Sequence, residues 1–437
     1  MRLRTTLILF LICAGLGGYL YFFDQKLPTT DELQEKSKLV FQVKSSDVEK
    51  LQFQTAGSQI LCERKENTGQ WWVTQPLNAK ADPSTIDTLL SRLESLEKWS
   101  DLGKAQSSDY GLQSPQNEIL FWVRGKQEKL SFGNKAAIGN QRYAAAGDGT
   151  VFLIDEGSVG IFNKELFDFR DKTLLEGSVP QVTEITVRKN GGVVAGCKKD
   201  DKGNWKIEQS ASYRGDQNRI EDFIRECTGL KASQFVMEQA ADLVSLGLQP
   251  PEGEISLWRE GQTEPQRLLI GKNPEGKEDF YAKLENQPNI VLVGAGVKNI
   301  LRKEIIALRD KRLFTFDEAQ LKRLEWVQGE QSWKFERKEG KWDPEKVQNA
   351  VKQLTWMTFL MLASAPNESD LFPSDQVKVL KGWGENSEPL FIFTVGKRAD
   401  EAQEYYYGKV SGSDEIYILS AGQVENLLAL IPSQKSS

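Results

Sequence analysis

Three stretches of the sequence decide the fold: DPSTIDTLLSRLESL at 82–96, DQNRIEDFIRECTGL at 216–230 and DPEKVQNAVKQLTWM at 343–357. Counted from the opening aspartate, apolar residues occupy the same offsets in all three stretches, and these offsets lie on one face of a helix. Each aspartate suits the N-cap, and Pro83 and Pro344 suit the first helical position. The sequence therefore predicts the same amphipathic helix three times.

The residues around these stretches repeat as well. A tryptophan precedes each helix, at Trp71, Trp205 and Trp342, and in each copy an apolar run typical of a strand ends at a glycine. These glycines are Gly133, Gly271 and Gly396. The segment FDFRDKTLL at 167–175 matches IALRDKRLF at 306–314, and we expect it to close the first two copies. The matches indicate three tandem copies of one structural unit.

The predicted fold class is α+β, with an N-terminal single transmembrane helix followed by three tandem α+β repeats. In each repeat we expect antiparallel strands in an early hairpin group and a later meander, with one amphipathic helix covering the hairpins. The repeats are predicted at 41–178, at 179–317 and, in shortened form, at 318–432, and residues 433–437 are predicted to be a tail.

The first residues predict a membrane anchor. Arg2 and Arg4 precede an uncharged run over 5–23, which at about 1.5 Å per residue crosses a hydrocarbon core of about 30 Å. We expect residues 1–4 to be the cytoplasmic end and 24–40 to be a polar tether. The positive-inside rule then predicts a single-pass protein of the inner (cytoplasmic) membrane, with its N-terminus inside and the bulk of the chain periplasmic.

A cleaved signal peptide is the alternative for this segment. Gly15 and Gly17 are small residues of the kind that a signal peptidase requires. The apolar and aromatic run over 19–23 continues beyond those glycines, and aromatic residues at this depth are typical of an uncleaved anchor. The sequence therefore favours the anchor.

Composition excludes several classes of function. The formal net charge of -6 and the absence of a basic block argue against nucleic acid as a partner. The chain has no histidine, which excludes Ser-His-Asp triads and histidine-ligated zinc. Cys62, Cys197 and Cys227 are too few for a disulfide scaffold and are expected to be structural. We predict no metal and no cofactor.

Two further patterns suggest chemistry but have structural explanations. GKNPEGKE at 271–278 resembles a phosphate-binding loop, but Glu278 stands where the loop needs Ser or Thr, so we predict no nucleotide. Paired carboxylates could form a glycosidase site. The recurring acids are explained by helix capping or, for Asp171 and Asp310, by salt bridges or capping beside a neighbouring arginine. We predict no enzyme activity.

Aromatic residues are the remaining candidates for a binding surface. They are found at Trp71 and Trp72, at Trp122 and Trp258, and at 405–407. Because side chains alternate along a strand, one of two adjacent aromatic rings must face outward. Packing between repeats is the structural explanation, and contact with a partner or a glycan is the functional one. The residues singled out for such contact are Trp71, Trp72, Tyr405 and Tyr407.

Several of these motifs together resemble a known family. They are the Gly-x-Trp strand, the Ala-Asp-Pro helix start at Ala81, the Tyr-Gly-Leu-x-x-Pro turn at Tyr110, the strand-ending Gly133 and the Arg-Asp-Lys segment at Arg170. With the N-terminal apolar run, they resemble the bacterial domain-of-unknown-function family 4340, in tandem copies. The third copy departs from the pattern, with Leu-Phe-Pro at 371–373 in place of the Gly-Leu turn.

The resemblance implies a role but no established chemistry. Members of that family are often encoded beside ABC transporter components of the gliding-motility type. This context implies a non-catalytic accessory or scaffold subunit of an envelope complex, with the permease and ATPase of a transporter as partners. The alternative is a cell-wall or polysaccharide-binding module that uses exposed aromatic residues, and the third hypothesis is a hydrolase.

Overall fold

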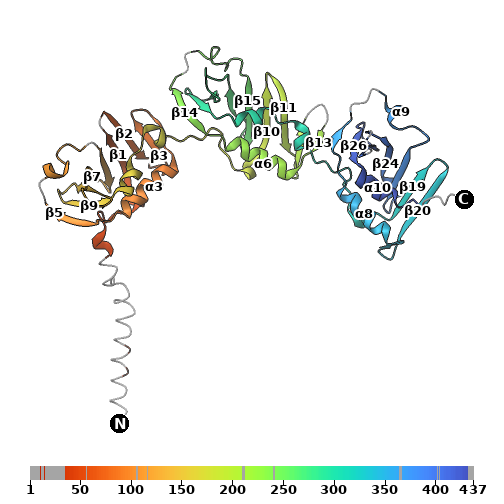
Figure 1. Cartoon of the computed structure of the whole chain (residues 1–437), viewed down its shortest axis with the longest axis horizontal. Coiled ribbons are helices and arrows are strands. Elements are labelled where there is room, and N and C mark those ends of the chain that lie inside the picture. The colour runs from red at the N-terminus through yellow and green to blue at the C-terminus, as the bar shows by residue number, and fades with distance from the viewer. Residues whose placement is uncertain are drawn as a thin grey trace, which may run out of the picture. The chain divides into compact units, whose positions relative to one another are not determined.

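The structure is a computed structural model that describes Phe10, Ala14 and residues 35–431, apart from 56, 105–106, 116, 209–211, 240–241, 364–366, 401 and 403. The chain divides into two compact units. One contains Met1–Glu176, Thr228–Glu252 and Leu268–Val297. The other contains Gly177–Cys227, Gly253–Arg267 and Lys298–Ser437. Figure 1 shows three sheets that follow one another along the chain.

The first repeat is built on a nine-stranded antiparallel sheet in the order β4-β3-β2-β1-β6-β7-β8-β9-β5. Its strands are β1 Val48–Thr55, β2 Ser58–Arg64, β3 Trp71–Gln75, β4 Ala79–Lys80, β5 Ser100–Gly103, β6 Asn117–Val123, β7 Lys126–Lys135, β8 Gln141–Ala146 and β9 Val151–Asp155. Its helices are α3 Pro83–Glu94, α4 Glu156–Phe162 and α5 Leu166–Phe169, with 3-10 turns at Ser45–Asp47 and Ser107–Tyr110. Residues of α3, α4 and the sheet share one core.

The second repeat has the same strand order, β13-β12-β11-β10-β15-β16-β17-β18-β14. Its strands are β10 Val182–Lys189, β11 Gly192–Lys199, β12 Trp205–Glu208, β13 Ser212–Arg214, β14 Ala232–Met237, β15 Gly253–Arg259, β16 Gln266–Ile270, β17 Phe280–Leu284 and β18 Ile290–Val293. Its helices are α6 Gln217–Thr228 and α7 Val297–Leu301, with 3-10 turns at Val179–Gln181 and Ile305–Leu308.

The third repeat has an eight-stranded sheet in the order β21-β20-β19-β23-β24-β25-β26-β22. Its strands are β19 Arg323–Gln328, β20 Gln331–Lys338, β21 Lys341–Trp342, β22 Met361–Leu362, β23 Lys378–Trp383, β24 Pro389–Arg398, β25 Tyr405–Val410 and β26 Tyr417–Ser420. Its helices are α8 Lys346–Trp356, α9 Glu368–Leu371 and α10 Ala421–Leu428, with a 3-10 turn at Glu318–Gln320.

The predicted fold class, a transmembrane helix followed by α+β repeats, is wrong, because the described chain consists mainly of three large antiparallel sheets. We expected the early hairpins and the later meander of each repeat to be separate groups. Instead β1 pairs with β6, and β10 pairs with β15 in the same way, so both groups join one sheet. These pairings bring together segments far apart in sequence, and no local pattern encodes them.

Within the described part of the chain, no helix has both the length and the apolar character needed to cross a membrane. The transmembrane helix was predicted over 5–23. Apart from Phe10 and Ala14, that segment lies outside the described residues.

The three predicted amphipathic helices are present as α3, α6 and α8, and Figure 1 shows each beside its own sheet. The inward faces carry the predicted apolar residues. They are Ile86, Leu89, Leu90 and Leu93 in α3, Ile220, Phe223, Ile224 and Cys227 in α6, and Val347, Ala350, Val351 and Leu354 in α8. Asp82 caps α3 by accepting a hydrogen bond from the Thr85 N–H at 2.7 Å, and Asp216 accepts one from Arg219 N–H at 3.2 Å.

The predicted cap of the third helix is wrong. Helix α8 begins at Lys346 with Glu345 at the N-cap position, so Asp343 and Pro344 lie before the helix. In the first copy residues 72–81 separate Trp71 from Asp82, whereas Asp343 directly follows Trp342 of β21. The chain must leave the strand before it can turn into a helix, and Asp343 and Pro344 form that connection.

A helix follows the last meander strand of each repeat, and these helices, α4, α7 and α10, are not predicted by the sequence. Glycines explain the omission, because glycine lowers helix propensity by about 1 kcal/mol relative to alanine. Gly157 and Gly160 lie in α4, and Gly422 lies in the first turn of α10.

The Arg-Asp-Lys segment that we predicted to close a repeat also opens the next one. Phe169 belongs to the first core, yet three residues later the Lys172 carbonyl accepts a hydrogen bond from the Ala232 N–H at 2.9 Å. The Lys311 carbonyl accepts one from the Phe359 N–H at 3.0 Å in the same way. Each of these segments therefore belongs to two neighbouring repeats.

Candidate functional site

The outer face of the first sheet carries a row of side chains across neighbouring strands. Along β3, Trp71 and Val73 point into the core, so Trp72 points outward. Trp72 pairs with Glu63 of β2, Glu63 pairs with Lys50 of β1, and Lys50 pairs with Trp122 of β6. We call these four residues the Trp72–Trp122 row. Three strand spacings separate its two tryptophans, which is roughly 14 Å.

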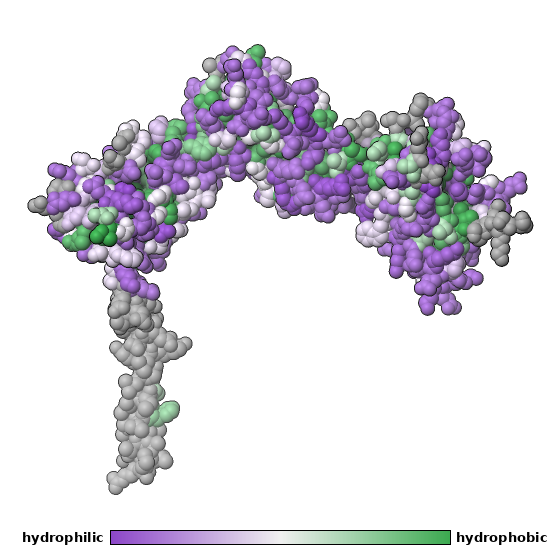
Figure 2. All heavy atoms as spheres, in the orientation of Figure 1, coloured by the Kyte–Doolittle hydropathy of each residue, from purple (hydrophilic) through white to green (hydrophobic). Residues whose placement is uncertain are grey.

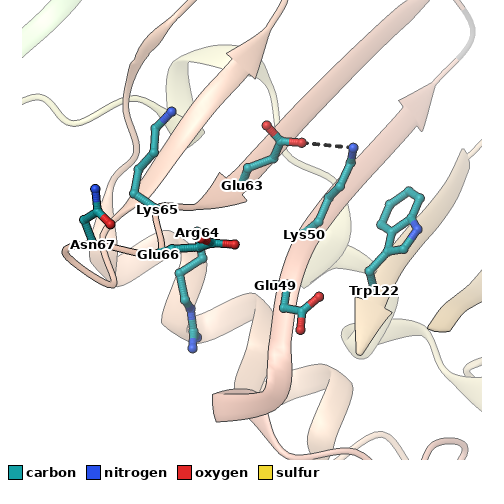
Figure 3. Close-up of a pocket in the computed structure, with 8 residues that line it drawn as sticks. All are labelled: Glu49, Lys50, Glu63, Arg64, Lys65, Glu66, Asn67 and Trp122. Carbon is teal, nitrogen blue, oxygen red and sulfur yellow. Dashed lines mark ion pairs between the residues drawn. The ribbon is translucent and has the colours of Figure 1, made fainter. Parts of the chain in front are cut away.

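Electrostatic contacts hold the row together. Figure 3 shows Lys50 between Glu63 and Trp122, and the Lys50 ammonium lies 2.9 Å from the Glu63 carboxylate. The same ammonium lies 5.0 Å from the centre of the Trp122 ring, and the Lys65 ammonium lies 5.7 Å from the centre of the Trp72 ring. The hydrogen bond from Lys50 lowers the pKa of Glu63, so the Glu63 carboxylate is ionised at neutral pH.

A shallow hollow of about 550 Å³ lies beside this row. The residues that line it are Glu49, Lys50, Glu63, Arg64, Lys65, Glu66, Asn67 and Trp122, so its acidic and basic side chains are equal in number (Figure 3). Hydrophilic residues cover most of the described surface seen in Figure 2. A balanced, polar hollow beside two partly exposed indoles suits a partner that offers hydrogen bonds and a flat apolar face.

The pattern of a tryptophan beside two opposite charges recurs in the other repeats. In the second sheet Trp258 pairs with Glu184, which pairs with Lys198, and the two charged groups lie 2.9 Å apart. In the third sheet Trp383 pairs with Arg323, and Arg323 pairs with Glu336 of β20. Trp122 and Trp258 are half-buried and Trp383 is buried. The first two repeats therefore share a surface row, and in the third the tryptophan of the corresponding row is buried.

The structure places the four predicted contact residues differently from one another. Trp71 is only 8% exposed and belongs to the first core, so its ring is not available on the surface. Trp72 faces outward in the row described above. Tyr405 and Tyr407 lie half-buried on one side of β25, next to Ser420 and Ile418 of β26. The two tryptophans and the two tyrosines lie in different units, so they are described as separate surfaces.

The family model described as Domain of unknown function (DUF4340) matches the chain twice, over residues 71–212 and 205–376. Together the two matches cover more than half of the chain. The chain belongs to the DUF4340 family. The two DUF4340 matches begin at Trp71 of β3 and Trp205 of β12, and each ends in the next repeat. The matches support tandem copies, but the bounds of the matches are shifted along the chain relative to the bounds of the sheets. No curated protein and no solved structure matches the chain.

Within the described residues, no group of three or more Cys, Asp or Glu side chains is arranged to hold a metal ion. Asp171 and Asp310 serve the fold, as predicted, although not with the adjacent arginines. Asp171 accepts a hydrogen bond from the Thr173 N–H at 2.9 Å, and Asp310 pairs with Arg214 at 2.8 Å.

The cysteines of the first two repeats are core residues. Cys62 and Cys197 occupy equivalent strands, β2 and β11, and each is fully buried, which confirms their predicted structural role. Burial raises the pKa of each of these two thiols to about 12. Cys227 is buried in the apolar face of α6, and burial raises its pKa as well. Thiols of this kind carry almost no thiolate at neutral pH.

We therefore expect the cysteines of the folded protein to resist thiol–disulfide exchange with a thiol reagent. In a Cys13→Ser variant, Cys62, Cys197 and Cys227 should react with Ellman's reagent at pH 8 roughly a hundredfold or more slowly than in 8 M urea, because both burial and the raised pKa values suppress the nucleophile. Absorbance at 412 nm measures the reaction. A folded-state rate within tenfold of the unfolded rate would contradict the burial of these thiols.

Proposed function

We propose that the chain is a non-catalytic accessory or scaffold subunit of an ABC-transporter-like envelope complex of the gliding type. In this proposal it is attached to the cytoplasmic membrane at its N-terminal end, with the bulk of the chain on the extracytoplasmic side. The observation that carries the scaffold role is that the first two repeats share a surface row of tryptophan and paired charges. Repeated units of this kind supply contact surface in scaffold proteins.

The class of partner comes from the family. The resemblance to this family implies an association with transporter components, and this association points to a permease and an ATPase as partners. The Trp72–Trp122 row is the part of the surface that we assign to the contact, since tryptophan is enriched where protein interfaces gain most of their free energy.

The experiment is affinity purification of the tagged full-length protein from its native membrane, followed by mass spectrometry. A chain lacking residues 1–23 serves as the control for membrane attachment. We expect an ATPase and its permease with the full-length protein, and their recovery should fall at least tenfold with Trp122→Ala. Trp99→Ala is the matched control, because Trp99 is 73% exposed and lies outside the row. Recovery of no membrane partner would overturn the proposal.

A cell-wall glycan is the second candidate partner. The observation that favours it is the pair of partly exposed indoles at Trp72 and Trp122 beside a hollow with balanced charges, since sugar rings stack on indole faces. Sedimentation with purified wall glycan tests it. Binding that is lost with Trp72→Ala, together with failure to recover a transporter, would replace the first proposal with this one.

A further inference from the structure

A second hollow, which we call the basic cleft, lies where the second repeat meets the third within one compact unit. Its volume is about 670 Å³, which is within the range of small-molecule sites. It is lined by 204–206, 214–219 and 310–312 from the second repeat and its connecting segment, and by Trp356 and Thr358 at the end of α8.

The basic cleft has an excess of positive charge. The basic side chains that line it are Lys206, Arg214, Arg219, Lys311 and Arg312, and the acidic ones are Asp216 and Asp310. Asp310 is already neutralised, since its carboxylate lies 2.8 Å from Arg214 and 2.7 Å from Arg312. Arg219 lies 3.5 Å from Asp216, and Lys206 lies 3.8 Å from Asp200 outside the cleft. The Lys311 ammonium donates a hydrogen bond to the Leu360 carbonyl at 3.0 Å, which leaves its charge in place. In a chain of net charge -6, this local excess of cations favours an anionic ligand.

An exposed indole completes the cleft. Trp356 is the last residue of α8, and 73% of its surface is exposed although the helix buries its other large apolar residues. An indole in this setting offers a flat apolar face beside the cations. A pyranose ring stacks on such a face, and a carboxylate on the ring can pair with Lys or Arg.

The junction between the first and second repeats, which we call the first junction, lacks several of these features, so they are not needed for folding. The position of Trp356 in α8 is occupied by Ser95 in the first copy and by Gly229 in the second. The positions of Arg219 and Arg312 are occupied by threonines in the first copy, Thr85 and Thr173. The backbone pairing at the two junctions is nevertheless the same, with bridges between Thr173 and Lys231 and between Arg312 and Thr358. The indole and the extra cations are therefore not required to join two repeats.

We propose that the basic cleft binds an acidic saccharide, with the sugar ring on Trp356 and its carboxylates against Lys206, Lys311 and the neighbouring arginines. This inference goes beyond the proposed transporter association. It uses different residues from the Trp72–Trp122 row, and binding by the purified protein requires no other subunit.

Isothermal titration of the full-length protein in mild detergent tests the proposal, with trigalacturonate as the acidic probe and maltotriose as the neutral one. We expect trigalacturonate to bind at least tenfold more tightly than maltotriose, with an affinity that falls as salt is added. Trp356→Ala should weaken binding at least tenfold, and Lys311→Gln should weaken it several-fold and reduce its salt dependence. Trp99→Ala should leave the Kd within twofold, because Trp99 has the same 73% exposure outside the cleft.

Three results would overturn the proposal. They are no binding of trigalacturonate, equal binding of maltotriose, or an equal effect of Trp99→Ala and Trp356→Ala. Triglutamate provides the remaining comparison. If it binds as well as trigalacturonate and Trp356→Ala changes neither, the cleft is an electrostatic site for acidic peptides. Because Trp356 is exposed, its replacement should leave the circular dichroism spectrum unchanged, so a loss of binding cannot be attributed to unfolding.

Discussion

Replacing Gly271 with alanine is expected to lower the free energy of unfolding by about 2–3 kcal/mol, the cost of forcing an atom into a packed site. A Cβ at this position would lie 2.2 Å from the carbonyl oxygen of Leu246 and 3.1 Å from a side-chain carbon of Leu248. The carbonyl belongs to the backbone of a tight turn, so it cannot move aside as a flexible side chain would. Gly271 and this turn lie in one compact unit, and Leu246 and Leu248 of the turn belong to a small apolar cluster.

The same close approach recurs in each repeat. A Cβ at Gly133 would lie 2.3 Å from the Tyr110 carbonyl oxygen, and one at Gly396 would lie 2.3 Å from the Leu371 carbonyl oxygen. The third repeat has lost the Gly-Leu turn of the other two, yet it places a backbone carbonyl in the same position. In each repeat a carbonyl oxygen of the turn packs against the glycine at the end of the strand. The fold therefore requires a glycine at this position.

Urea unfolding followed by circular dichroism measures the effect of Gly271→Ala. Gly294→Ala is the matched control in the same repeat, because no atom lies within 4 Å of a Cβ built there and its backbone is not in the left-handed region. We expect the control to change the free energy of unfolding by less than about 0.5 kcal/mol. Equal effects of the two variants would show that the close approach does not limit the choice of residue at position 271.

The three amphipathic helices could be predicted from the sequence, but the pairing of distant strands into one sheet could not. The offsets of Ile86, Leu89 and Leu93 place α3 correctly because helical periodicity is a local property. The pairing of Phe53 with Ile119 depends on contacts between distant segments. The start of α8 was misplaced because Asp343 resembles the capping aspartates of the other copies, although it lacks the connecting residues before it.

The candidate site was likewise predicted in part. Alternation along β3 predicts that one of Trp71 and Trp72 faces outward, and the structure shows that Trp72 does. The neighbours of Trp72 in the row could not be predicted, because they depend on strand register. Lys50 stands opposite Trp122 because the β1–β6 register runs without a shift from Thr55 to Lys50, and the irregularity follows only between Lys50 and Val48. The cations and the indole of the basic cleft come from segments far apart in sequence, so no single motif marks it.

Replacing Arg309 with alanine is expected to lower the free energy of unfolding by roughly 3 kcal/mol, because it leaves a buried carboxylate without its cation. The Arg309 guanidinium donates hydrogen bonds to both carboxylate oxygens of Glu415, at 2.6 and 2.5 Å. The two side chains are only 12% and 16% exposed. The guanidinium also lies 3.9 Å from the centre of the Tyr213 ring. Arg309 therefore joins the second repeat to the third within one unit.

Arg170 is the residue equivalent to Arg309 at the junction between the first and second repeats, and its replacement serves as the comparison. It makes the equivalent bidentate pair with Glu238 and lies 3.5 Å from the centre of the Phe235 ring. Glu238, however, is 54% exposed, so it returns to water when the arginine is removed. We expect Arg170→Ala to cost less than Arg309→Ala, about 1–2 kcal/mol, mainly through lost packing.

The cost of Arg309→Ala should also depend on pH. Burial alone would raise the pKa of Glu415, but the hydrogen bonds and positive charge of Arg309, with the hydroxyl groups of Tyr417 and Tyr213, lower it overall. Because this pKa is lower in the folded than in the unfolded chain, the stabilisation is complete at neutral pH and is lost as the pH falls through the folded-state value. The difference between Arg309→Ala and the unaltered protein should therefore shrink on acidification.

Urea unfolding at pH 7 and at successively lower pH values measures this dependence, and hydrogen exchange identifies the segments that open. Glu415→Gln is the control for titration, because it keeps the shape of the side chain and removes the proton-binding group. In the Glu415→Gln background, Arg309→Ala should cost less, and its cost should no longer change with pH. A cost that stays constant with pH in the unaltered background, or that equals the cost of Arg170→Ala, would mean that packing against Tyr213, and not the ion pair, holds this junction together.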